Sequence, residues 1–192
     1  LEILMRQYAA LQDKTLFISA GHGDRDPGAA AHGHTEAAIV LEFRDLLADY
    51  LTERVIIDRD GAPGKNLSLR DAVGAAKGHD LAVEFHCNAA SSPTATGVET
   101  LSAGHHYPLG NALCQAISDA LGIANRGAKG EASGQHSRLA FISRGGGLIV
   151  ELFFLSNKHD LAAYIANRRR CVEAVGDVLV NEICAPALER PA

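Results

Sequence analysis

The chain has 192 residues, with 18 Lys and Arg against 23 Asp and Glu, so its formal net charge is −5 at pH 7. This length predicts a single domain that buries roughly 70% of the surface of the unfolded chain. No apolar run approaches the roughly 18 residues that a membrane-spanning helix needs, so we expect no integral membrane association. The acidic balance, without a basic stripe interleaved with aromatic residues, argues against a nucleic-acid-binding protein.

The two ends of the chain are expected to lie outside the folded domain. Residues 1–14 form an N-terminal extension that lacks the basic start, apolar stretch and cleavage site of a secretory signal. Met5 is the sole methionine, so we expect natural translation to begin there and residues 1–4 to be extraneous. Residues 186–192 contain two prolines and are expected to form a short tail. We therefore predict one domain over residues 15–185.

Short apolar runs and helical patterns alternate along this domain. The apolar runs at 16–18, 55–57, 81–83 and 148–150 are typical of strands buried in a parallel sheet. A helical repeat of apolar residues spans 39–51, a second spans 109–121, and a third, which includes Ile165, spans 161–179 as one or two helices. Gly and polar clusters at 21–34, 61–66, 88–97 and 125–137 predict loops.

This alternation predicts the α/β fold class, with a mostly parallel twisted sheet and helices on both of its faces. In such folds the functional site lies at the carboxyl ends of the strands. Two histidines are expected at that edge. The first strand runs into a glycine-rich turn that contains His22, and the third strand carries Glu84, His86 and Asn88 at alternate positions, so these three share one side of the strand.

Glu36 is expected close to both histidines. It stands in the first turn of the helix that follows the glycine-rich loop, in the middle of the apolar face of that helix. A buried carboxylate there needs a cation. Two imidazoles and one carboxylate suit Zn²⁺ with an open fourth position, so His22, Glu36 and His86 are predicted to bind one zinc ion per chain.

Glu151 is a candidate general base. It lies inside the apolar run of the last core strand, and no Lys or Arg is near it in the sequence. A carboxylate beside zinc can take a proton from the metal-bound water and pass it to a leaving amine.

Each of these residues also has a simpler interpretation. A histidine before a glycine at a strand end is more often structural, and Glu36 could be a carboxylate favoured by the helix dipole. Glu151 could pair with a distant arginine, Glu84 could face solvent on an edge strand, and His34 is near enough to Glu36 to be a rival ligand. Only the joint placement of the residues favours a metal site.

At these residues the chain resembles the zinc-dependent N-acetylmuramoyl-L-alanine amidases of the amidase type 3 family, over about residues 16–179. Four motifs occur in the order of the family: residues 18–23 with 26–28, Glu36, residues 86–89, and residues 148–152 with 154–157. The resemblance implies His22, Glu36 and His86 as zinc ligands and Glu151 as the catalytic carboxylate.

The resemblance extends to a strand at 97–100, which contains Glu99 and borders the site, and to Arg126 in a loop that could meet substrate. Asn88 is expected to orient His86 or the following loop. Two residues depart from the family pattern. Glu84 replaces a small polar residue and could act behind the metal ligands, and Phe153 replaces a glycine.

The resemblance implies hydrolysis of the amide between N-acetylmuramic acid and L-Ala in peptidoglycan, and cell-wall lysis by a phage or prophage endolysin. Two alternatives stay open. One is a zinc amidohydrolase or carboxypeptidase acting on a small soluble peptide or acyl-amino acid, and the other is a non-catalytic wall-binding module.

The expected partner is peptidoglycan, both glycan strand and stem peptide, and the expected oligomeric state is a monomer. An endolysin stays in the cytoplasm until it is released to the periplasm or cell wall at lysis. The alternative is an exported bacterial enzyme whose leader is missing from this chain.

Overall fold

A computed structural model describes residues 13–23, 25–133 and 139–185. They form a six-stranded sheet in the order β4-β1-β5-β8-β6-β7 and a separate hairpin, β2-β3. All neighbouring pairs in the large sheet are parallel except β6 and β8, which confirms the predicted α/β fold. The strands are β1 (Thr15–Ala20), β2 (Ala30–Ala31), β3 (His34–Thr35), β4 (Ile56–Arg59), β5 (Leu81–Asn88), β6 (Val98–Ser102), β7 (Asn125–Gly130) and β8 (Leu148–Phe154).

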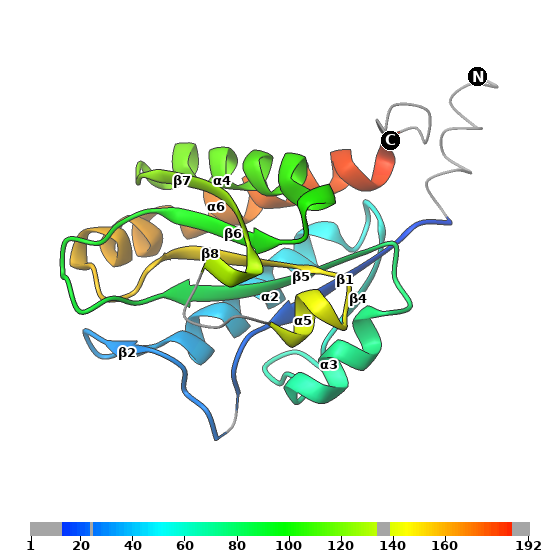
Figure 1. Cartoon of the computed structure of the whole chain (residues 1–192), viewed down its shortest axis with the longest axis horizontal. Coiled ribbons are helices and arrows are strands. Elements are labelled where there is room, and N and C mark those ends of the chain that lie inside the picture. The colour runs from blue at the N-terminus through cyan, green and yellow to red at the C-terminus, as the bar shows by residue number, and fades with distance from the viewer. Residues whose placement is uncertain (1–12, 24, 134–138, 186–192) are drawn as a thin grey trace.

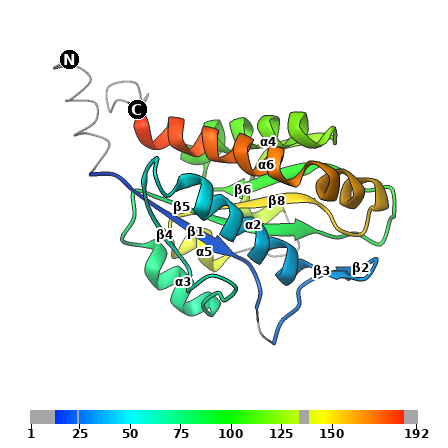
Figure 2. The ribbon, with the colours of Figure 1, turned by 180° about the vertical axis from the view of Figure 1, so that it is seen from behind.

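Helices cover both faces of the sheet, but unequally (Figure 1). Three long helices pack on one face and on each other, with α2 and α6 side by side in Figure 2: α2 (Glu36–Leu51), α4 (Tyr107–Leu121) and α6 (Lys158–Cys184). The other face carries only two short helices, α3 (Leu69–Ala76) and α5 (Ala140–Ser143). Short 3-10 turns occupy 104–106 and 131–133.

The face of the sheet that carries only α3 and α5 has an apolar part and a polar part. On that side, Phe17, Ala82, Leu101 and Ile149 pack against α3 and α5 in one apolar cluster. Side chains alternate between faces with period two, so the next residues on this side, toward the carboxyl ends of β1, β5 and β8, are polar. They are Ser19 on β1, Glu84 and His86 on β5, Glu151 on β8 and, on antiparallel β6, Glu99.

Two parts of the predicted element pattern were wrong. Residues 125–130 form the edge strand β7 rather than a loop, because pairing with β6 stabilises a sequence that has no β-branched or aromatic residue. Ile165 is 52% exposed and Tyr164 is buried in its place. The reason is a non-helical residue, Asn167, which divides α6 and changes the helical phase between its halves.

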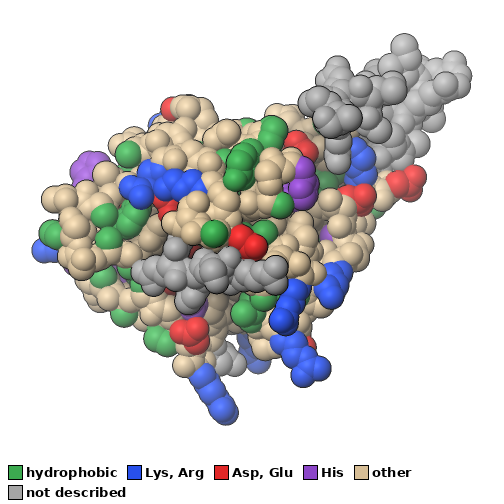
Figure 3. Space-filling model, viewed as in Figure 1, with side chains coloured by type: hydrophobic (Ala, Val, Ile, Leu, Met, Phe, Trp, Pro, Cys, Tyr) green, Lys and Arg blue, Asp and Glu red, His purple; other side chains and the backbone are tan. Residues whose placement is uncertain are grey.

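No helix among the described residues is long and apolar enough to cross a membrane. On the face shown in Figure 3, Lys and Arg side chains are interspersed with acidic and histidine side chains. Residues 1–12 of the extension predicted over 1–14, the tail predicted over 186–192 and part of the loop predicted over 125–137 lie outside the described residues.

Asp160 connects the start of β6 and the end of β8 to α6. Its carboxylate is fully buried and accepts hydrogen bonds from Thr96 Oγ1 at 2.5 Å, from the backbone N–H of Gly97 at 2.9 Å and from the backbone N–H of Phe154 at 3.2 Å. Because Gly97 precedes β6 and Phe154 ends β8, this single side chain holds both strands beside the helix.

We expect Asp160→Ala to lower the free energy of unfolding by about 3 kcal/mol, because it leaves two buried N–H groups and a hydroxyl without their charged acceptor. Urea unfolding followed by circular dichroism measures the change. Asp119→Ala, which removes an exposed carboxylate of α4, should change stability by less than about 0.5 kcal/mol. Equal effects of the two substitutions would contradict the role assigned to Asp160.

Candidate metal centre and active site

His22 is held in an unusual backbone conformation directly after β1. Its φ is 62°, in the left-handed region that non-glycine residues seldom adopt. The Asn66 side-chain amide donates to the carbonyl oxygens of His22 and Ala20, and the Gly21 N–H donates to the Phe85 carbonyl at 2.9 Å. These bonds position the imidazole of His22 over the end of β5.

Two glycines leave the space that the site needs. A Cβ at Gly21 would collide with the ring of His86. Gly28 has a φ of 63°, and a Cβ there would lie 2.6 Å from Glu36 Oε2 and 2.7 Å from His22 Cδ2. The glycine-rich turn therefore lets the backbone pass directly against the histidine and glutamate side chains.

Glu36 is the central residue of the cluster. It is the first residue of α2, after the N-cap Thr35, and its side chain is buried as predicted. Oε1 lies 2.9 Å from His86 Nδ1 and 3.2 Å from His22 Nε2, and Oε2 accepts from the backbone N–H of Ala29 at 2.9 Å. Burial alone would raise the pKa of Glu36, but hydrogen bonds from the two histidines outweigh it and hold that pKa well below its ordinary value.

The second ring nitrogen of each histidine faces another carboxylate. His86 Nε2 lies 3.0 Å from Glu84 Oε1, and His22 Nδ1 lies 2.8 Å from Asp26 Oδ2. Burial lowers the pKa of His86, but hydrogen bonds to Glu36 and Glu84 raise it further, so the net pKa is well above its ordinary value. The hydrogen bond to Glu36 is the main reason that the pKa of His22 is also raised.

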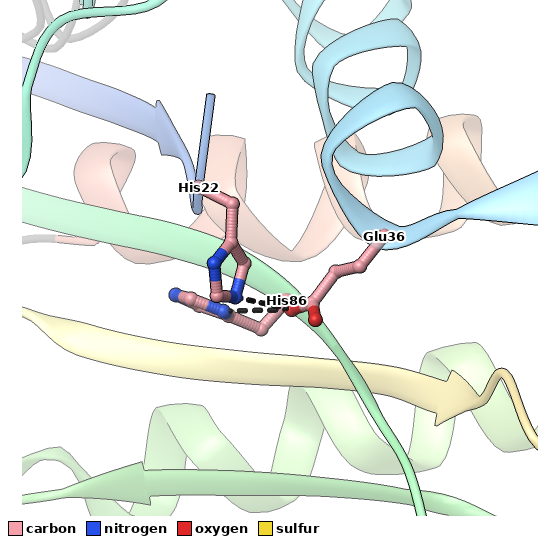
Figure 4. A group of neighbouring side chains, drawn as sticks. All are labelled: His22, Glu36 and His86. Atoms are coloured by element: carbon pink, nitrogen blue, oxygen red, sulfur yellow. Dashed lines mark hydrogen bonds and ion pairs between the residues drawn. The ribbon is translucent and has the colours of Figure 1, made fainter. Parts of the chain in front are cut away.

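The three side chains converge on one point (Figure 4). One ligand atom each from His22, Glu36 and His86 lie within 4.8 Å of one another, which is close enough for a single metal ion to contact all three. The donor set of two nitrogens and one carboxylate oxygen fits a divalent metal, and each histidine has a carboxylate behind it, as metal-binding histidines usually do. The rival ligand His34 lies on the exposed hairpin and is not part of this cluster.

Glu151 lies beside the cluster without belonging to it. It pairs in register with His86 across β5 and β8, and with Glu99 across β6 and β8. Its Oε2 is buried and has no hydrogen-bond partner, and no cation of the described residues forms an ion pair with its carboxylate. Burial raises the pKa of Glu151 to about 7. Such a carboxylate can exchange a proton near neutral pH.

Glu99 forms ion pairs with two basic residues at the same edge of the sheet. Glu99 Oε2 accepts from Arg126 Nε at 2.5 Å and from Lys129 Nζ at 2.6 Å, while Oε1 accepts from Asn88 Nδ2 at 3.0 Å. Arg126 lies on the edge strand β7, where a loop was expected. Asn88 contacts Glu99 and the N–H of Ala89, and no hydrogen bond joins it to His86.

The sequence did not reveal several residues that lie behind or beside the cluster. Lys129 was missed because its contact with Glu99 depends on β7. Arg44 and Asp60 form a fully buried ion pair with a distance of 2.6 Å, and Ser19 joins it to Glu84. One signal was present, since Arg44 falls on the apolar face of its helix, where an arginine needs a buried partner. The exposed-edge interpretation of Glu84 was wrong, because β5 is a central strand and Glu84 is buried.

The fold and the cluster together define an α/β protein with a His/Glu/His cluster that could hold a metal ion at the carboxyl edge of its sheet. A family model described as N-acetylmuramoyl-L-alanine amidase matches residues 16–180. The chain belongs to this family, Amidase_3.

Individual relatives agree with this assignment. The chain is similar to a crystal structure from Neisseria meningitidis assigned as an N-acetylmuramoyl-L-alanine amidase, with 36% identity, a TM-score of 0.83, and coverage of 91% of this chain and 98% of that chain. It is 37% identical over 91 residues to an endolysin of Bacillus phage SPP1, and 33% identical over 93 residues to the uncharacterised protein YqiI of Bacillus subtilis. These segments cover 45% and 47% of this chain, but only 33% and 45% of the two relatives.

Metal binding at this centre should displace protons. Because the metal-free pKa values of His22 and His86 are raised, protons compete with a metal ion for both rings up to a higher pH than for an ordinary imidazole, and a ligating nitrogen must be unprotonated. We expect metal affinity to fall as the pH is lowered from 8 to 6, with release of roughly one proton for each protonated histidine. Titration calorimetry in buffers of different ionisation enthalpy measures this release.

A matched pair of variants tests the assignment of the ligands. His22→Ala should lower both the affinity and the number of protons released, whereas His34→Ala, at an exposed histidine of the nearby hairpin, should change neither. An affinity that does not vary between pH 6 and 8 would contradict the proposed linkage.

Proposed function

We propose that the chain hydrolyses the amide that joins the lactyl group of N-acetylmuramic acid to L-Ala, the first residue of the peptidoglycan stem peptide. The observation that carries this proposal is the buried Glu151 Oε2, which has no hydrogen-bond partner among the described residues, next to the His22, Glu36 and His86 cluster. Membership of the amidase family supports the choice of bond.

We propose Zn²⁺ as the metal, one ion per chain, with His22, Glu36 and His86 as its ligands. Two imidazoles and one carboxylate form a ligand set found in catalytic zinc sites, which keep one position open. Bound there, zinc supplies Lewis acidity, which polarises a carbonyl group and lowers the pKa of a water molecule.

Glu151 is proposed to move the proton during the reaction. Its carboxylate accepts a proton as water oxygen forms a bond to the amide carbon, and it donates that proton to the L-Ala nitrogen as the C–N bond breaks. The products are the free lactyl carboxyl group and a stem peptide with a free amino terminus. The burial that raises the pKa of Glu151 in the metal-free protein supports this exchange, because it makes the carboxylate a stronger base than an exposed one at the same distance from the metal.

Digestion of purified peptidoglycan tests the bond and the metal together. We expect soluble stem peptides with free L-Ala amino termini by mass spectrometry, lost after chelation and regained when zinc is restored. New reducing sugar ends would show that another bond is cleaved. Hydrolysis of small acyl-amino acids alone would indicate a soluble-substrate hydrolase, and tight wall binding without products would indicate a non-catalytic module.

The same assay separates catalysis from metal binding at Glu151. Glu151→Gln should lower the rate by about 10²- to 10⁴-fold, because the amide cannot accept the proton, while zinc content stays at the wild-type level. Wild-type activity should fall as the pH drops through the pKa of Glu151, which a bound cation moves below the metal-free value of about 7. Glu53→Gln, the same substitution at an exposed position after α2, is the control. Retention of most of the activity in Glu151→Gln would contradict its role.

We also propose that Arg126 and Lys129 bind a carboxylate of the stem peptide, with Glu99 and Asn88 holding them in place. Two cations share the single charge of Glu99, so the group has a net positive charge beside Glu151. The side chains of Arg126 and Lys129 are 38% and 30% exposed, so both remain accessible to a ligand.

Removal of both cations should weaken substrate binding more than it slows the chemical step. With a soluble muropeptide, the double variant Arg126→Ala/Lys129→Ala should raise KM by about 10-fold or more, as expected for a lost charged hydrogen bond, with a much smaller change in kcat. The double variant Arg54→Ala/Lys77→Ala makes the same change in net charge away from the site. An unchanged KM in the first variant, or the same increase in both, would contradict the proposed contact.

We propose that residues 15–185 are the catalytic domain, that it acts as a monomer, and that its substrate includes both the glycan strand and the stem peptide. The place of action is the cell wall, because peptidoglycan is there. Similarity to the endolysin of phage SPP1 supports release at lysis, and an exported bacterial enzyme is the alternative.

A further inference from the structure

The carboxylates that contact the outer ring nitrogens of His86 and His22 differ in how far they are exposed to water. Behind His86, the Glu84 carboxylate lies 3.0 Å from Nε2, and its side chain is 5% exposed. Behind His22, the Asp26 carboxylate lies 2.8 Å from Nδ1, but its side chain is 72% exposed. Water competes for Asp26 and screens its charge, whereas Glu84 acts in a medium where electrostatic interactions are stronger.

Glu84 is itself held from behind. Ser19 is its neighbour in register across β1 and β5, and Ser19 Oγ lies 3.1 Å from Glu84 Oε2. The same hydroxyl lies 3.1 Å from Asp60 Oδ2. Asp60 directly follows β4 and donates its backbone N–H to the Ile18 carbonyl at 3.1 Å. Residues on β5, on β1 and directly after β4 therefore form a continuous series of polar contacts, in which Ser19 has one hydroxyl proton to donate between the two carboxylates.

This series of polar contacts continues from Asp60 to the buried side chain of Arg44. Arg44 Nη1 donates to Asp60 Oδ1 at 2.6 Å and to the Asp60 carbonyl, and Nη2 donates to the Ala62 and Lys65 carbonyls at 3.1 and 3.2 Å. The Ala20 N–H also donates to Asp60 Oδ1, at 3.2 Å. Burial of this ion pair is costly in free energy unless its polar atoms are satisfied, and here hydrogen bonds to backbone groups satisfy them. The loop after β4 is thereby joined to α2 and to the end of β1.

We propose that Glu84, supported by Ser19, Asp60 and Arg44, is a positioning residue that fixes the orientation and tautomer of His86 for metal binding; this rests on the proposed metal site. In the neutral ring, a hydrogen bond from His86 Nε2–H to Glu84 makes Nδ1, which faces Glu36, the unprotonated nitrogen that can bind a metal ion. The carboxylate also makes the ring a better electron donor, as carboxylates behind metal-binding histidines do.

Metal affinity, measured by chelator competition without substrate, tests the proposal. Glu84→Gln keeps the size of the side chain and removes its charge, and it should weaken metal binding by about 10- to 100-fold. Asp26→Asn makes the same change in charge at the exposed partner of His22 and should weaken binding by less than about threefold, because water replaces the lost contact. The absorption spectrum of the Co²⁺ form should change in Glu84→Gln and remain close to wild type in Asp26→Asn.

Ser19→Ala provides a second, smaller perturbation. It deletes only the hydroxyl between Glu84 and Asp60, so it should produce a weaker form of the affinity loss and spectral change seen in Glu84→Gln. Thermal unfolding of each metal-free variant establishes that it is folded. If Glu84→Gln does not fold, Ser19→Ala still decides the question.

Three results would overturn the proposal. They are wild-type affinity and spectrum in Glu84→Gln, equal losses in Glu84→Gln and Asp26→Asn, or wild-type affinity and spectrum in Ser19→Ala. Because these measurements use no peptidoglycan, they are independent of which bond the protein cleaves. A chain that fails to digest peptidoglycan but loses metal affinity in Glu84→Gln would retain this role for Glu84 and lose the proposed function.

Discussion

The buried carboxylate of Glu36 is the interaction on which the rest of the site depends. Its two oxygens join the loop after β1 through His22, the hairpin through the Ala29 N–H, and β5 through His86 and the Cys87 N–H. The loop after β1, the residue before the hairpin and the distant strand β5 are therefore tied to the first residue of α2. A carboxylate with so many donors is held in its charged form despite burial, and in that form it can bind a metal.

The unequal covering of the sheet explains why the site lies where it does. Three long helices pack on one face, whereas α3 and α5 cover the other face at Phe17, Ala82, Ile149 and Leu101. Beyond these residues the strands continue, and period two places carboxylates and an imidazole on the part of the face that the short helices leave uncovered. One part of this face therefore packs against helices, and the other part holds the polar side chains of the site, all within one domain.

The predictable part of the site depended on local patterns. His22, Glu36, His86 and Glu151 could be located because each stands at a strand end, at a helix start or inside an apolar strand, and these positions can be recognised over a few residues. Lys129 and Asp60 could not be found in this way. Lys129 depends on a strand formed by pairing with β6, and the partner of Asp60 is Arg44, 16 residues away on a helix.

The sequence by itself determined the alternation of strands and helices, the carboxyl edge as the location of the site and the residue types gathered there, because hydrophobic period and strand polarity are local properties. Tertiary structure alone decided which nitrogen of each histidine faces Glu36, that Glu151 Oε2 lacks a partner within the described part of the protein, and that a buried series of contacts runs from Arg44 to Glu84. These features depend on distances between residues that are remote in the sequence, and such distances exist only after the sheet has assembled.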